Sequence, residues 1–122
     1  MKIVLAPNAF KGSLSAVEAA SAMAEGVLRA CPAAERVQVP VADGGDGLVD
    51  VLADALQGRM RSALVTGPRG EKVAAHFCHI PDQKTAVIEM ARASGLALLP
   101  EKRRDPTRTS TRGTGELIDA AL

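Results

Sequence analysis

The stretch MKIVLAPNAFKGSLSAVEAASAMAEGVLRACPAAERVQVPV (residues 1–41) decides the fold class of this chain. It joins a short apolar run at residues 2–5 to a second one at residues 37–41 through a turn-rich segment and a helical pattern. Ser15 and Glu18 form a capping box at the start of the helix. The helix is expected to bury a stripe of Val17, Ala20, Ala24, Val27 and Cys31. This strand–helix–strand order predicts two parallel strands joined by a helical crossover.

The pattern of elements changes near residue 58. Before this point, a second helix is predicted over residues 46–56, with an inner face of Leu48, Val51, Leu52 and Leu56. After it, three extended runs follow at residues 60–66, 72–80 and 84–90. We therefore predict an α/β protein. Residues 1–58 form an open parallel-sheet start of β-α-β-α order, and residues 59–122 form the strand-rich beginning of a second α/β subdomain.

A last helix is predicted to start at Gly115, with Thr114 as its cap. Its apolar face comprises Leu117, Ile118, Ala121 and Leu122. No capping glycine or basic turn follows this face, which is typical of an unfinished helix. We interpret the chain as a truncated N-terminal portion of a longer protein.

Composition narrows the classes of partner. The 122 residues carry a net charge of +1 and contain no Trp or Tyr and two Phe, which argues against nucleic acid as a partner. The N-terminal apolar run is too short for a signal peptide or a membrane span. Two cysteines make no disulfide framework. These features predict a cytoplasmic protein with no nucleic-acid or membrane partner.

The first loop that could carry chemistry follows the first strand. Lys11 stands beside Gly12 and Ser13, just before a helix. Such a group can hold a phosphate through a point charge, backbone amides and the helix dipole. The alternative is an exposed loop lysine without a ligand.

The second loop, ADGGDG, follows the second strand. Asp43 and Asp46 could bind magnesium or accept the proton of a substrate hydroxyl. Gly44 and Gly45 would let a ligand approach the backbone closely. The alternative is a plain turn in which Asp46 caps the next helix.

The third loop begins at the end of the last apolar run, where Glu89 is either functional or an ion-pair partner. Arg92 could pair with Glu89 or bind a carboxylate substrate, and Ser94 follows in the same loop. The fourth loop combines hydroxyls and glycines at a helix start, which is typical of an anion cradle. Its candidate phosphate-binding residues are Ser110, Thr111, Gly113 and Gly115.

Four motifs in order, APNAFKGSLSA, PVADGGDG, IEMARASGLALLP and DPTRTSTRGTGELI, resemble the bacterial glycerate kinase family over essentially the whole chain. The resemblance implies ATP-dependent phosphorylation of D-glycerate with magnesium, in a longer protein of two α/β domains. Lys11 and Asp43 would then be catalytic, and Asp46 would hold the metal. The chain departs from the family at Asn8-Ala9, where Asp-Ser is usual, and at Asp46, where Glu is usual.

Two interpretations from different classes remain, beside a third in which the chain is a structural or protein-interaction fragment. The first is a glycerate kinase of which this chain is an N-terminal part, inactive alone. The second is a module that binds a small anion or a nucleotide without turning it over, which the same four loops would suit equally.

Overall fold

The computed structural model describes residues 1–122 apart from the side chain of Asp82. The chain packs as two compact units, Met1–Val51 and Leu52–Leu122. The predicted mixed α/β class is confirmed, because the first unit holds a parallel pair of strands and the second an antiparallel sheet. The predicted assignment of residues 59–122 to a separate subdomain stays a prediction.

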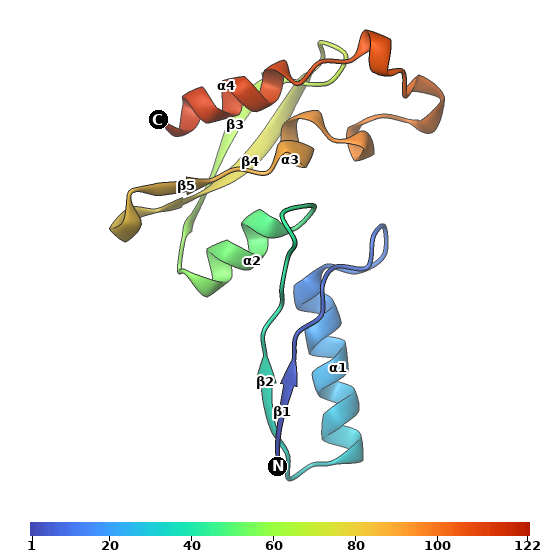
Figure 1. Cartoon of the computed structure of the whole chain (residues 1–122), viewed down its shortest axis with the longest axis vertical. Coiled ribbons are helices and arrows are strands. Elements are labelled where there is room, and N and C mark those ends of the chain that lie inside the picture. The colour runs from blue at the N-terminus through green and yellow to red at the C-terminus, as the bar shows by residue number, and fades with distance from the viewer. The chain divides into compact units, whose positions relative to one another are not determined.

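The first unit is built around two parallel strands, β1 (Lys2–Leu5) and β2 (Glu35–Gln38), joined by helix α1 (Ala16–Ala30) (Figure 1). The pairing runs in register from Lys2 opposite Glu35 to Leu5 opposite Gln38. The second strand thus lies two to three residues earlier than residues 37–41, because it pairs with a first strand of only four residues.

Helix α1 begins as its sequence predicts. The Ser15 amide donates to Glu18 Oε2 at 2.8 Å, and the Glu18 amide donates to Ser15 Oγ at 3.2 Å, which completes the capping box. Its buried stripe differs from the expected one and consists of Ala16, Ala19, Ala20 and Ala24. Val17 was wrongly included, since its side chain is 41% exposed, whereas the smaller alanines let the helix pack closely.

Helix α2 (Leu48–Ala55) follows the second loop and spans the division between the units. The predicted start at Asp46 is wrong by two residues, and Asp46 therefore does not occupy the capping position. The predicted inner face of this helix is also wrong in part. Val49 is fully buried, whereas Leu56 lies beyond the helix and is 40% exposed.

The second unit holds a three-stranded antiparallel sheet of order β3-β4-β5. The long strands β3 (Arg59–Thr66) and β4 (Lys72–Ile80) confirm two of the predicted runs. Strand β5 (Thr85–Val87) is shorter than residues 84–90, because the chain turns into helix α3 (Met90–Ser94). Short 3-10 turns then lead to helix α4 (Arg112–Ala121).

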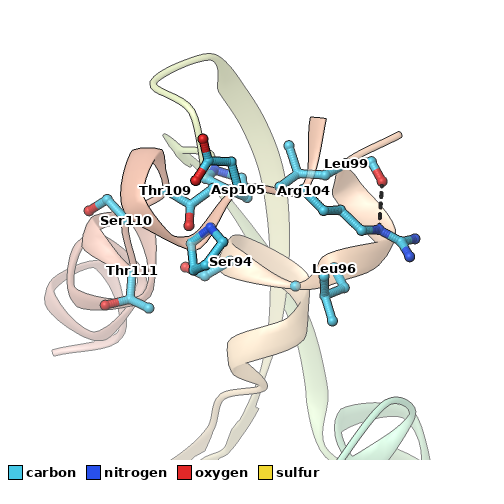
Figure 2. A pocket seen from close by; sticks show the side chains of 11 residues that line it. Ser94, Leu96, Leu99, Arg104, Asp105, Thr109, Ser110 and Thr111 are labelled. Carbon is cyan, nitrogen blue, oxygen red and sulfur yellow. Dashed lines mark hydrogen bonds between the residues drawn. The ribbon is translucent and has the colours of Figure 1, made fainter. Parts of the chain in front are cut away.

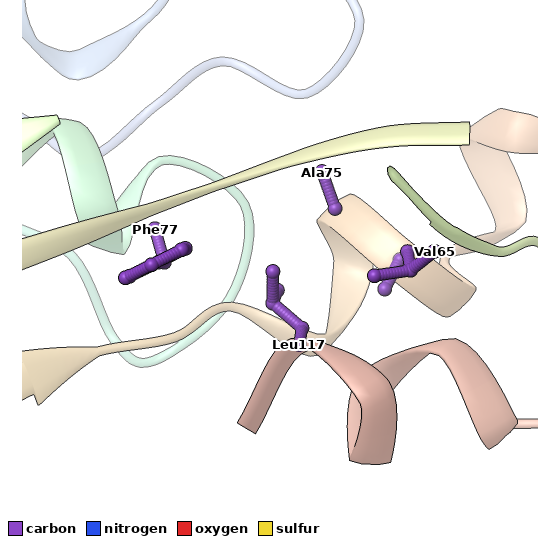
Figure 3. Packing of buried hydrophobic residues seen from close by; sticks show 5 residues of the cluster. Val65, Ala75, Phe77 and Leu117 are labelled. Atoms are coloured by element: carbon purple, nitrogen blue, oxygen red, sulfur yellow. The ribbon is translucent and has the colours of Figure 1, made fainter. Parts of the chain in front are cut away.

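The core of the second unit lies between its sheet and α4. Leu117 is fully buried and points from α4 toward Val65, Ala75 and Phe77, as Figure 3 shows. Ala93 of α3 completes this cluster. The alternation of Ala75 and Phe77 on β4 places both on the face that the helices cover.

The predicted start of α4 at Gly115 is wrong, because the helix begins three residues earlier and Thr111, not Thr114, precedes it. Gly113 therefore lies inside the first turn and is buried against β3. A Cβ atom at this position would overlap the carbonyl oxygen of Thr66. The missing side chain is what lets the helix approach the strand.

Gly113→Ala should therefore lower the free energy of unfolding, by about 1–3 kcal/mol, because the added methyl forces the helix away from β3. Gly115→Ala is the matched control. Nothing lies within 4 Å of a Cβ at Gly115, so alanine there should stabilise the helix by about 0.5–1 kcal/mol. Urea unfolding of both variants measures the two effects. Equal changes would contradict the close contact at Gly113.

Candidate functional site

The loops after the two parallel strands enclose a small polar pocket in the first unit. We call it the loop pocket; it measures about 400 Å³ and is lined by Asn8, Ala9, Lys11, Asp43, Gly45 and Asp46. Both loops leave the carboxyl ends of their strands, where ligands bind in open α/β sheets. The backbone keeps them side by side, since the Val39 amide donates to Leu5 O at 2.8 Å and the Val41 amide to Pro7 O at 3.0 Å.

Glycines shape the acidic loop of this pocket. Gly44 and Gly47 both have a φ of +93°, a left-handed conformation that L side chains rarely adopt. Asp46 lies between them, and Asp43 precedes them. The two predicted carboxylates and Lys11 are thus brought to one pocket. Ser13 and Gly44 are not among its lining residues, and Ser13 instead donates its amide to Phe10 O at 2.8 Å in a tight turn.

The donor set of the loop pocket suits a hard divalent cation. Magnesium binds proteins through one or two carboxylates and takes its other ligands from phosphates and water. Asp43 and Asp46 supply two carboxylates, and Asn8 supplies an amide group beside them. Among the side chains that the structure describes, no group of three or more His, Cys, Asp or Glu could hold a metal ion. Two carboxylates leave the other positions around a magnesium ion to phosphates and water.

The second unit contains a larger pocket, which we call the hydroxyl pocket. It measures about 690 Å³ and lies between the end of α3 and the start of α4 (Figure 2). Its lining residues are Pro68, Ser94, Gly95, Leu96, Leu99, Arg104, Asp105, Pro106, Thr109, Ser110 and Thr111. Three predicted phosphate-binding residues, Ser94, Ser110 and Thr111, are thus brought together.

Hydrogen bonds hold the hydroxyls of this pocket in place. Ser94 Oγ and Thr114 Oγ1 lie 2.8 Å apart and link α3 to α4. Ser110 Oγ accepts from the Arg112 amide at 3.1 Å, and the Ser110 amide donates to Pro68 O at 2.9 Å. The start of α4 is thereby tied to the turn after β3. Hydroxyls at a helix start can bind an anion together with the backbone amides of the first turn.

The chain matches the glycerate kinase family over residues 3–122. It belongs to the glycerate kinase family. It is 56% identical over 122 residues to glycerate kinase of Bacillus subtilis (strain 168) and equally to glycerate 2-kinase of Escherichia coli (strain K12), covering all of this chain and 32% of each relative. The crystal structure of glycerate kinase 2 from Salmonella typhimurium LT2 matches with a TM-score of 0.78 and 47% identity, covering 100% of this chain and 33% of that one. The chain thus spans about a third of the length of these relatives.

The expected resemblance to the glycerate kinase family is therefore confirmed. No helix in the described residues is both long and apolar enough to cross a membrane.

Glu89 and Arg92, both predicted to bind substrate, form an ion pair with each other. Glu89 is 3% exposed and precedes α3, and its Oε1 lies 3.4 Å from Arg92 Nε. Neither residue lines the hydroxyl pocket. The ion-pair alternative therefore describes their geometry, and their role toward a ligand stays a prediction.

Three residues of the second unit escaped the sequence analysis, two that line the hydroxyl pocket and one that joins α4 to β3. Arg104 and Asp105 line the hydroxyl pocket, although the basic stretch that contains Arg104 looks like an ordinary exposed loop. Hydrogen bonds from the Thr107 side chain and backbone lower the pKa of the Asp105 carboxyl. The third residue, Glu116, joins α4 to β3. The Arg112–Glu116 spacing of four residues was the available signal for its ion pair.

Glu116 holds the end of β3. Its Oε2 accepts from the Thr66 amide at 2.7 Å, and its Oε1 accepts from Thr66 Oγ1 at 3.0 Å and from Arg112 Nε at 2.8 Å. The backbone hydrogen bond from Thr66 is the main cause that lowers the pKa of the Glu116 carboxyl below its ordinary 4.5. The folded state thus favours the ionised form.

Glu116→Gln should lower the unfolding temperature near pH 7, because a neutral amide accepts these bonds more weakly. A carboxyl whose folded pKa is lowered stabilises the protein above its ordinary pKa, and this effect is lost as the pH falls through the folded pKa. The difference between variant and wild type should therefore shrink at about pH 3. Thermal unfolding followed by circular dichroism at both pH values measures it.

The control for this prediction is Glu101→Gln, which changes an exposed carboxylate of the same unit. It should leave the unfolding temperature unchanged at both pH values. A Glu116→Gln effect of the same size at about pH 7 and about pH 3 would show that the charge of Glu116 is not what stabilises α4 against β3.

Proposed function

We propose that the protein is an ATP-dependent kinase that phosphorylates D-glycerate to a phosphoglycerate in the cytoplasm. The observation that carries this proposal is the match along the whole chain to relatives named glycerate kinase, at 56% identity. Two pockets of suitable chemistry support it, one with carboxylates and a lysine and one with hydroxyls at a helix start.

The loop pocket would carry the charged part of the reaction. Transfer of a phosphoryl group requires positioning of the reactants and neutralisation of charge more than covalent help from the protein. Lys11 would neutralise phosphate oxygens, and Asp43 would orient the attacking hydroxyl of D-glycerate and accept its proton. Asp46 would hold magnesium, which when bound neutralises the charge of adjacent phosphate oxygens.

Asn8 is compatible with this assignment. The family pattern has Asp at this position, and Asn retains a carbonyl oxygen of the same reach while losing the charge. Asn8 Oδ1 accepts from the Ala9 amide at 2.7 Å, which fixes a side chain that lines the loop pocket. The two remaining carboxylates, Asp43 and Asp46, are enough for a magnesium ion that also binds phosphates.

The end of the hydroxyl pocket at the start of α4 would bind a phosphate group of the nucleotide. Ser94, Ser110 and Thr111 line it, and the backbone of Gly113 belongs to the first turn of α4, where amides face an incoming anion. Gly115 is the fourth residue of α4. We keep both glycines as phosphate-binding candidates and assign Gly113 the additional packing role described above.

The test is a chimera in which these 122 residues replace the matching segment of the Bacillus subtilis glycerate kinase. We expect ADP formation that depends on D-glycerate, measured with a coupled assay. The 122-residue chain alone, run beside it, should form no ADP. A folded chimera that binds nucleotide without forming ADP would instead favour a binding module.

In the same chimera, Asp43→Asn should lower kcat by about 100-fold or more, because the amide cannot accept the hydroxyl proton. Asp54→Asn is the matched control, since Asp54 is an exposed carboxylate on α2 that lines neither pocket. It should leave kcat unchanged. Near-normal turnover by the Asp43→Asn chimera would remove Asp43 from the catalytic residues.

A further inference from the structure

The hydroxyl pocket has a chemistry that distinguishes between the two reactants. We propose that it binds the adenosine part of the nucleotide, and that D-glycerate does not bind there. This inference rests on the proposed kinase function and goes beyond it, because it assigns one reactant to a pocket of the second unit.

The size of the pocket is the first argument. At about 690 Å³ it lies within the range of roughly 300–1,000 Å³ that is usual for small-molecule sites. A purine ring with its ribose fills a larger share of such a volume than a three-carbon acid does. D-glycerate is a three-carbon acid and would leave most of it filled with water.

The apolar wall is the second argument. The apolar lining residues are Leu96, Leu99 and Pro106, which we call the apolar wall. Leu96 is 63% exposed and supplies more surface than Leu99, which is 7% exposed. The face of a purine would remove this apolar surface from water, which is favourable. D-glycerate has no apolar face and would gain nothing from the same contact.

The charged groups are the third argument. In Figure 2, Leu96, Leu99 and Arg104 lie at one end of the pocket and Ser110 and Thr111 at the other. Arg104 Nε donates to Leu99 O at 3.4 Å, which keeps its guanidinium beside the apolar wall. A planar guanidinium stacks readily on an aromatic ring.

Asp105 selects against an acid and in favour of a sugar. Its Oδ1 accepts from the Thr107 amide at 3.0 Å and from Thr107 Oγ1 at 2.7 Å, so the carboxylate is held in place. A fixed carboxylate accepts hydrogen bonds from ribose hydroxyls, as acidic residues do in dinucleotide sites. Beside Asp105, the same charge repels a carboxylate such as that of D-glycerate.

The first experiment titrates the ¹⁵N-labelled 122-residue chain with adenosine and, separately, with D-glycerate. Adenosine should shift the amide signals of Leu96, Leu99 and Asp105 to saturation, and D-glycerate should leave them unchanged. The inference is overturned if D-glycerate shifts these signals to saturation, or if adenosine leaves them unmoved.

A matched pair of variants tests the apolar wall. Leu96→Asn should weaken adenosine binding roughly fivefold, because it removes the surface that the purine covers. Leu64→Asn changes a leucine of the same unit that is 69% exposed and lies outside the pocket, and it should leave the affinity unchanged. Equal effects of the two substitutions would overturn the assignment.

A third variant tests the contact with the sugar. Asp105→Asn keeps the oxygen that accepts from Thr107 and removes the charge. It should weaken binding of adenosine several-fold and leave binding of 2′,3′-dideoxyadenosine unchanged. An equal loss for both nucleosides would show that Asp105 does not contact the ribose.

Failure of this inference and failure of the kinase function give different results. In the Bacillus subtilis chimera, Leu96→Asn should raise KM for ATP and leave KM for D-glycerate unchanged. A rise in KM for D-glycerate alone would overturn the pocket assignment while the kinase function stands. Adenosine binding by the chain, with no ADP formed by a folded chimera, would reject the kinase function and leave the pocket assignment in place.

Discussion

The contact between the start of α4 and the end of β3 is the constraint on which the second unit depends. Glu116 accepts hydrogen bonds from both the amide and the hydroxyl of Thr66. Gly113 lets the backbone of α4 approach that of β3 because it lacks a side chain. Thr66 ends β3, and two residues later Pro68 accepts a hydrogen bond from the Ser110 amide through its carbonyl oxygen. The helix start, the strand end and one wall of the hydroxyl pocket therefore form a single hydrogen-bonded arrangement. Leu117, one residue beyond Glu116, carries the same contact into the core.

The loop pocket arises from a different constraint. Parallel pairing places the carboxyl ends of β1 and β2 next to each other, so the loops that follow must share one edge. One loop contributes Lys11 and the other contributes Asp43 and Asp46, which brings opposite charges to one small polar space. Such a mixture suits a phosphate with a divalent cation, because a lysine can neutralise phosphate oxygens and carboxylates can bind the metal.

Much of the fold was predictable from periodicity and local hydrogen bonding. The extended run at residues 72–80 and the Ser15–Glu18 pair are local signals, and both predictions are confirmed. The start of α4 was not predictable, because Gly113 reads as a loop residue and its reason for lying in a helix is a contact with Thr66, far away in sequence. The same holds for Arg104 and Asp105. They lie among short 3-10 turns, which have no hydrophobic period, and only the fold brings them to a pocket.

The alanine face of α1 has a consequence for how the first unit opens. Ala16, Ala19, Ala20 and Ala24 allow close packing, yet each removes little apolar surface from water. A unit whose interior buries so little apolar surface gains little from the hydrophobic effect. Its amides should therefore exchange with solvent through cooperative opening, and the free energy of that opening should be low. Any ligand that binds only the closed form raises that free energy in proportion to the logarithm of its concentration. Occupancy of the loop pocket and order in the first unit are thus linked equilibria.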